Sequence, residues 1–328
     1  MRYDRRVSEE LLQAISDDGP LAGLIDLVRA DRGHRDLQLR RVKQPECWAT
    51  LYVGLTKVLD VRERNGSFRL DAHEAYRELS GFDESWRLSQ PLEDLQNCWQ
   101  EVLAYVETAI SAVPPEYTSA EGAVQSAMSS GITDEFRVVD REAVLGHTNS
   151  GARSGTLDPV EKALTEALVA AGNGEPWWPG ARGKVSFGGE LDLLAIDEAG
   201  RLLVIMVKPA NAVAGIAKSP AQVALYATLW SMWLDESDDA TEVLQGMLDQ
   251  RARLGLGRAG PIVPPTTVVP VIAIGPGKRS KEALPRLQHV AKAVQPVLDT
   301  QQSLQPLEVW LVDEQGRVDS KEVLGLTS

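Results

Sequence analysis

The chain has 328 residues, 43% of them hydrophobic and 25% charged, a composition typical of globular proteins rather than of disordered or fibrous ones. This length is enough for two domains that each bury a core. The formal net charge of −13 argues against a simple nucleic-acid binder, because phosphate contacts need clustered lysine and arginine. It lowers the expectation of DNA binding without excluding it.

The sequence carries no signal for secretion or for membrane insertion. Its first residues are polar, and no apolar run approaches the roughly 18 residues that span a bilayer. Its two cysteines, Cys47 and Cys98, are too few for a disulfide framework and lack the spacing of a zinc site. We therefore expect a protein of the reduced cytoplasm that has no membrane association.

Residues 1–150 predict a mixed α/β domain. Apolar residues recur at helical spacing in Ser8–Arg29 and Leu92–Val113. Trp48–Glu63 and Ser67–Leu70 are expected strands, joined across Asn65-Gly66, a pair that type I′ hairpin turns favour. A basic run is expected to be a solvated face rather than a binding site; it contains Arg29, Arg32, Arg35, Arg40, Arg41 and Lys43. The sequence does not show what this domain does, and recognition of a partner or substrate is the role we assign to it.

The small, polar stretch Ser150–Gly155 predicts an exposed linker, which divides the chain into domains 1–150 and 151–328. Beyond it, Asp158-Pro159-Val160-Glu161 has the residues that begin a helix, and this helix is expected to reach Ala171. Strands and helices then alternate. The expected strands are Glu190–Ile196, Leu202–Lys208, Val268–Ile274 and Leu307–Val312, and the expected helices are Ser219–Leu234 and Ser280–Leu298. Apolar strands that alternate with helices indicate an α/β sheet covered on both faces.

Two polar residues of the expected hairpin Glu190–Lys208 are candidates for chemistry. Asp192 shares a strand face with Glu190, and Lys208 shares one with Met206, because alternate residues of a strand project to the same side. Lys208 follows six apolar residues, and lysine is seldom buried without a partner. Taken alone, each residue is more simply explained as the polar end of a strand.

Taken together, the residues of this hairpin resemble the active site of the PD-(D/E)XK nuclease superfamily. In that family an aspartate is followed, after about a dozen residues, by a (D/E)-X-K triplet at the end of an apolar strand. Gly189–Leu194 resembles the aspartate strand, and Met206-Val207-Lys208 resembles the triplet in its position and its lysine. Gln222 and Tyr226, which lie on one face of the next helix, resemble the Q-X-X-X-Y element of the RecB and lambda-exonuclease branch.

The resemblance implies a restriction-endonuclease-like mixed sheet flanked by helices over residues 151–328. It also implies a metal-dependent DNA nuclease that acts in DNA repair, restriction or phage defence. In the family, the aspartate and the acid of the triplet hold Mg²⁺ or Mn²⁺, which stabilises the negative charge of the transition state. By this resemblance Asp192 binds the metal, Lys208 assists the phosphate chemistry, and Gln222 and Tyr226 support the site.

Met206 departs from the family pattern, because a thioether does not bind a hard cation such as Mg²⁺. A second carboxylate could come from Glu190 or from Glu161, which is equally well explained as a helix-capping residue. The competing interpretation is a catalytically impaired nuclease-fold module that binds nucleic acid, or a protein partner in a larger complex. The sequence does not distinguish a natural loss of hydrolysis from a deliberate one.

Other candidate motifs are weaker. No glycine-rich phosphate-binding motif follows a strand. The four histidines lack the spacing of metal ligands; they are His34, His73, His147 and His289. Trp177-Trp178 could stack on a base, but an anchored loop that packs on the core is the expected role.

Overall fold

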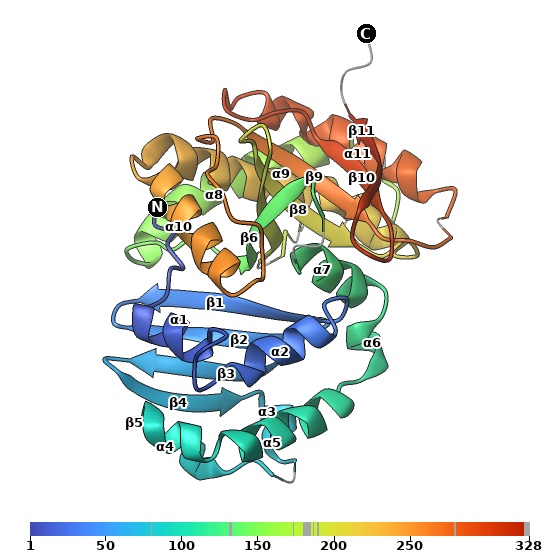
Figure 1. Cartoon of the computed structure of the whole chain (residues 1–328). Coiled ribbons are helices and arrows are strands. Elements are labelled where there is room, and N and C mark those ends of the chain that lie inside the picture. The colour runs from blue at the N-terminus through green and yellow to red at the C-terminus, as the bar shows by residue number, and fades with distance from the viewer. Residues whose placement is uncertain are drawn as a thin grey trace. The chain divides into compact units, whose positions relative to one another are not determined.

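The computed structural model describes residues 1–79, 81–130, 133–172, 174–179, 185, 187–188, 190–278 and 280–324. The chain is mixed α/β with two sheets (Figure 1). It divides into two compact units. Unit 1 contains residues 1–3, 133–242 and 261–328, and unit 2 contains residues 4–132 and 243–260. In the part of the chain that the structure describes, no helix combines the length and apolarity needed to cross a membrane.

Unit 2 is built on a five-stranded antiparallel sheet in the order β1-β2-β3-β4-β5. Its strands are β1 (Arg35–Lys43), β2 (Glu46–Val53), β3 (Thr56–Arg64), β4 (Ser67–Ala72) and β5 (Gln90–Pro91). The helices of this unit are α1 (Glu9–Ile15), α2 (Gly23–Ala30), α3 (Glu74–Arg77), η1 (Glu84–Arg87), α4 (Leu92–Asn97), α5 (Trp99–Ser111), α6 (Pro115–Thr118) and α7 (Glu121–Ser129).

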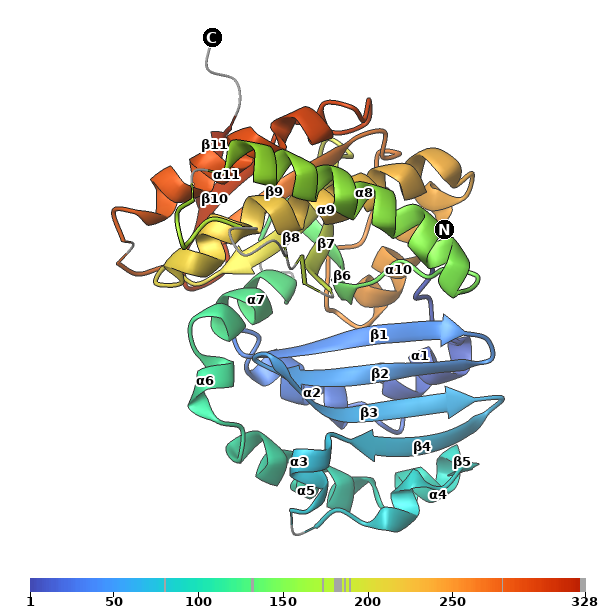
Figure 2. The ribbon, with the colours of Figure 1, turned by 180° about the vertical axis from the view of Figure 1, so that it is seen from behind.

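One face of this sheet carries the core of unit 2. Apolar residues at alternate positions of the strands, such as Leu39, Ala49 and Val61, pack with residues of α1, α2 and α5. In Figure 2 the strands lie in front of α1 and α2, so the opposite face of the sheet is turned to the viewer.

Three elements expected in residues 1–150 are each two elements in the structure. The expected helix Ser8–Arg29 is α1 and α2, and residues 16–22 between them are not helical. The prediction of a single strand over Trp48–Glu63 was wrong, because the chain reverses at Gly54 and forms β2 and β3. Gly54 has φ +57, and a Cβ there would lie 1.8 Å from the carbonyl oxygen of Tyr117, so only glycine fits.

The turn at Asn65-Gly66 agrees with the sequence prediction. Both residues have positive φ, 53° and 78°, as a type I′ turn requires, and they join β3 to β4. The expected helix Leu92–Val113 is divided at Cys98 into α4 and α5.

Four arginines of the basic run have partners within unit 2. Arg29 forms an ion pair with Asp17, and its Nη2 donates to the carbonyl oxygen of Leu254 at 2.9 Å. Arg32 and Arg35 likewise donate to backbone carbonyls, and Arg41 forms an ion pair with Asp4. These arginines therefore tie α2 and β1 to neighbouring segments.

Unit 1 is built on a six-stranded mixed sheet in the order β11-β10-β9-β8-β7-β6. Its strands are β6 (Phe136–Ala143), β7 (Leu191–Asp197), β8 (Leu202–Lys208), β9 (Val268–Ile274), β10 (Glu308–Val312) and β11 (Val318–Val323). β8, β9 and β10 are parallel, and the remaining pairs are antiparallel. The main part of unit 1 thus begins at Thr133 rather than at the expected residue 151, because β6 belongs to its sheet.

Three helices pack together over one side of this sheet: α8 (Ser150–Ala171), α9 (Val213–Glu236) and α11 (Ala283–Leu298) (Figure 2). α9 lies against β8 and β9. The expected linker Ser150–Gly155 was wrong, because these residues form the first turns of α8 and Asn149 caps its N-terminus. A further helix, α10 (Ala240–Arg253), begins in unit 1 and continues into unit 2.

Candidate functional site

Asp192 and Lys208 lie on the neighbouring strands β7 and β8. The Nζ atom of Lys208 is 3.6 Å from Oδ2 of Asp192, and the same oxygen accepts the backbone N–H of Val207 at 2.7 Å. The side chains are 11% and 19% exposed, so both charges are largely withdrawn from water. The structure therefore brings together the two residues that the sequence singled out.

The strand register explains this meeting. β7 and β8 are antiparallel, and Leu193 lies opposite Ile205. Leu194 lies opposite Val204, so Asp192, Met206 and Lys208, each an even number of residues away on its own strand, project from that same face. The turn between the strands is closed by Asp197, which accepts the backbone N–H of Ala199 and of Arg201.

Met206 is the residue that the motif resemblance aligns with the second acid. It is 3% exposed. A thioether there gives a buried apolar neighbour to Asp192 and no oxygen ligand.

Gln222 and Tyr226 of α9 lie against the segment that leads into β7. A Cβ added to Gly188 would be 3.2 Å from Nε2 of Gln222 and 3.5 Å from Oη of Tyr226. Gly188 also has φ +86, so two independent constraints favour glycine at this position. Gly189, the first residue of the motif that resembles the aspartate strand, lies outside the described residues.

Tyr226 is 8% exposed, and its hydroxyl is buried without a hydrogen-bond partner among the described residues. Burial raises the pKa of Tyr226, and the negative charges of Asp192, Glu190 and Glu161 raise this pKa further. The three carboxylates named as metal ligands therefore all lie within electrostatic reach of one phenol. Glu161 of α8 is half-buried, and Glu190 is exposed just before β7.

These carboxylates do not form a metal site as they stand. Among the described residues, no three His, Cys, Asp or Glu side chains are arranged to hold a metal ion together. Oδ2 of Asp192 is already bonded to the backbone of β8, and the facing position holds Met206. The donor set at the two strand positions therefore does not fit Mg²⁺ or Mn²⁺.

Comparison of the chain with protein-family models, curated proteins and solved structures finds no match. Function is therefore inferred from the geometry of the site and from the motif resemblance.

Trp177-Trp178 belongs to an anchored loop, as the sequence predicts. Trp178 is 4% exposed, and its Nε1–H donates to the carbonyl oxygen of Leu168 at 2.8 Å. Its ring lies 4.8 Å from that of His289, and the guanidinium of Arg286 lies 4.9 Å from the ring centroid of Trp177. In a second basic stretch of the sequence, Lys278, Arg279 and Lys281, Arg279 lies outside the described residues.

Proposed function

We propose that unit 1 is a restriction-endonuclease-like module of the PD-(D/E)XK type that binds DNA and whose metal-dependent hydrolysis is impaired by Met206. The observation that carries this proposal is the ion pair of Asp192 and Lys208 on neighbouring strands, close to a helix that presents Gln222 and Tyr226. The order and spacing of these residues along the chain match the family motif, and the arrangement of β7, β8 and α9 supports it.

Each polar group has a separate task in this proposal. Lys208 offers an ammonium group to a phosphate oxygen, and the amide of Gln222 and the hydroxyl of Tyr226 donate to the same substrate. The carboxylates around Tyr226 oppose a phosphodiester, so binding at this point is expected to be weak and sensitive to salt. In the family the cation offsets this repulsion, and the thioether of Met206 provides no ligand for it.

The change Met206→Glu tests the proposal, since it restores a carboxylate opposite Asp192. With Mg²⁺ or Mn²⁺, we expect plasmid cleavage and a rise in melting temperature that the unaltered protein does not show, because a ligand that binds only the folded state stabilises it. Met206→Gln is the matched control, with similar size and no charge. Adding Asp192→Ala to Met206→Glu should abolish both effects.

Two results would contradict the proposal in different ways. Strong cleavage by the unaltered protein that depends on Glu161 or Glu190 would show that the metal site was relocated rather than lost. A Met206→Glu protein that folds but shows neither a metal response nor cleavage would contradict the assignment to the nuclease family.

A further inference from the structure

A row of one tryptophan and three arginines crosses the sheet of unit 2. Arg40 of β1 lies opposite Trp48 of β2, Trp48 lies opposite Arg62 of β3, and Arg62 lies opposite Arg69 of β4. Residues directly opposite each other share a face, so all four project from the side that α1, α2 and α5 do not cover. Arg40 is buried, at 4% exposed, so the part of the row that a ligand can reach is Trp48, Arg62 and Arg69.

Trp48 and Arg62 form the centre of this row. The guanidinium of Arg62 lies 4.7 Å from the ring centroid of Trp48, which is half-buried. This cation–π contact holds the guanidinium over one face of the indole ring. Arg62 is also held by Asp60, whose Oδ2 accepts from Nη2 at 2.7 Å.

Two like charges directly opposite each other destabilise a sheet, and Arg62 and Arg69 are such a pair. Glu46 offsets the repulsion: its Oε1 is 2.8 Å from Nη2 of Arg69 and 3.6 Å from Nη1 of Arg62. The hydrogen bond from Arg69, followed by the charges of both arginines, lowers the pKa of the Glu46 carboxyl. Glu46 is therefore an internal anion between two guanidinium groups.

A hollow of about 110 Å³ opens beside this ion pair. It is lined by Glu46, Arg62, Glu63, Arg64, Ser67, Arg69 and Ser89. Glu63 is turned toward other partners, the backbone N–H of Gly66 at 2.7 Å and the hydroxyl of Ser8 at 2.6 Å. Within the hollow, Glu46 is thus the carboxylate that competes for the arginines.

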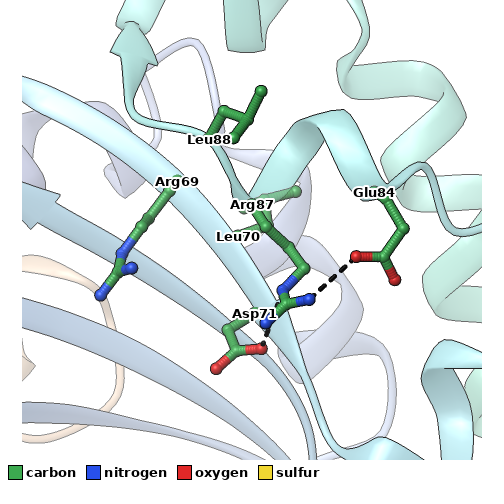
Figure 3. Close-up of a pocket in the computed structure, with 6 residues that line it drawn as sticks. All are labelled: Arg69, Leu70, Asp71, Glu84, Arg87 and Leu88. Atoms are coloured by element: carbon green, nitrogen blue, oxygen red, sulfur yellow. Dashed lines mark hydrogen bonds and ion pairs between the residues drawn. The ribbon is translucent and has the colours of Figure 1, made fainter.

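The adjacent hollow, of about 310 Å³, differs in charge balance (Figure 3). There Arg87 is turned toward Glu84, at 2.9 Å, and Asp71, at 4.0 Å, whereas Arg69 points away from this group. Arg69 and Arg87 have equally exposed side chains, 44% each. Arg87 is neutralised by two carboxylates, whereas Arg69 shares the carboxylate of Glu46 with Arg62.

We propose that this arginine–tryptophan row binds single-stranded nucleic acid, with a phosphate in the hollow and a base against Trp48 and Arg62. A guanidinium matches phosphate oxygens with two parallel N–H groups, so a phosphate can replace Glu46 between Arg62 and Arg69. The row offers a stacking surface next to the phosphate position. A base inside a duplex is already stacked on both faces, so only a single strand can place a base on this surface. The inference concerns unit 2 and does not rest on the function proposed for unit 1.

The test is fluorescence anisotropy of a labelled oligothymidylate with the full chain, at low salt and with EDTA present. Arg69→Gln should weaken binding by about three- to tenfold and reduce the salt slope by about 0.7 for the lost contact. Glu46→Gln should strengthen binding by a similar factor, because it removes the competing anion. Arg87→Gln is the matched control and should leave binding within about twofold, since Arg87 is committed to its own carboxylates.

A second comparison tests the stacking part. Trp48→Leu keeps apolar bulk in a half-buried position, and it should weaken binding of the single strand more than binding of a duplex. Equal losses from Arg69→Gln and Arg87→Gln, or no gain from Glu46→Gln in a folded protein, would overturn the proposed phosphate position. A preference for duplex that Trp48→Leu leaves unchanged would overturn the single-strand assignment. Neither result depends on the cleavage assay with Met206→Glu.

Discussion

The ammonium group of Lys208 lies 3.6 Å from the carboxylate of Asp192, and each side chain is more than four-fifths buried. An ion pair so placed has lost most of its hydration, so removal of one member leaves the other charge in a poor environment. Met206 adds a buried apolar neighbour on the same strand face. Its side chain hinders water from solvating a charge that has lost its partner. The pair therefore has structural consequences that can be measured without any knowledge of substrate.

The first prediction concerns this ion pair. Asp192→Asn and Lys208→Met should each reduce the free energy of unfolding by about 1–3 kcal/mol, and the double variant should lose less than the sum. Urea denaturation of the four proteins gives the coupling energy. The exposed pair Lys162–Glu166, with its charged atoms 3.8 Å apart, is the control and should couple by less than about 0.5 kcal/mol. Additive losses at Asp192 and Lys208 would show that the contact contributes nothing of its own.

The second prediction concerns the buried hydroxyl of Tyr226. Because this hydroxyl has no partner among the described residues, Tyr226→Phe should leave stability at neutral pH unchanged or slightly higher. Tyr105→Phe is the contrasting change, since its hydroxyl donates to the carbonyl oxygen of Tyr76 at 2.9 Å and the loss should cost about 1 kcal/mol. Thermal denaturation of both variants decides the matter. A large loss in Tyr226→Phe would mean that an ordered water or ion bonds to the hydroxyl in solution.

The third prediction is the pH dependence that follows from Tyr226. Burial and the three neighbouring carboxylates raise the pKa of this phenol in the folded protein above the value of about 10 in the unfolded chain. Above pH ~10 the unfolded chain releases this proton first, so the stabilisation is complete below that pH and is lost as the pH rises. Tyr226→Phe should therefore lose less stability between neutral and alkaline pH than the unaltered protein does. Equal losses would show that Tyr226 ionises as a free tyrosine.

The strands of the candidate site could be predicted from the sequence because their apolar runs are continuous. Val268–Ile274 and Leu202–Lys208 are strands with the expected bounds, and Asp192 and Lys208 meet as their spacing indicates. The arrangement around Tyr226 was harder to predict from the sequence, because the distance from Glu161 to Tyr226 depends on how α8 packs against α9.

The row of arginines was missed for a different reason. Reading Trp48–Glu63 as one strand hid the reversal at Gly54, and this reversal places Trp48 opposite Arg62. Gly54-Leu55 lacks the asparagine or aspartate that usually accompanies glycine in a short hairpin, so the turn gave a weak local signal. Similarly, the glycines of Ser150–Gly155 indicated a linker, but these exposed residues extend α8, whose later turns carry its buried Leu164 and Leu168.

The last prediction tests that helix directly. Gly155 lies within α8, its φ is not positive, and a Cβ there would meet nothing within 4 Å. Gly155→Ala should therefore raise the free energy of unfolding by about 0.5–1 kcal/mol, because alanine loses less backbone entropy than glycine when a helix forms. Gly188→Ala should have the opposite effect, since Gly188 has φ +86 and a Cβ would be 3.2 Å from Gln222. Urea denaturation of both variants measures these changes. Limited proteolysis at residues 150–155 is a second test of whether this segment is a helix or a flexible linker. In a flexible linker, Gly155→Ala would leave stability unchanged and the peptide bonds around it would be cut readily.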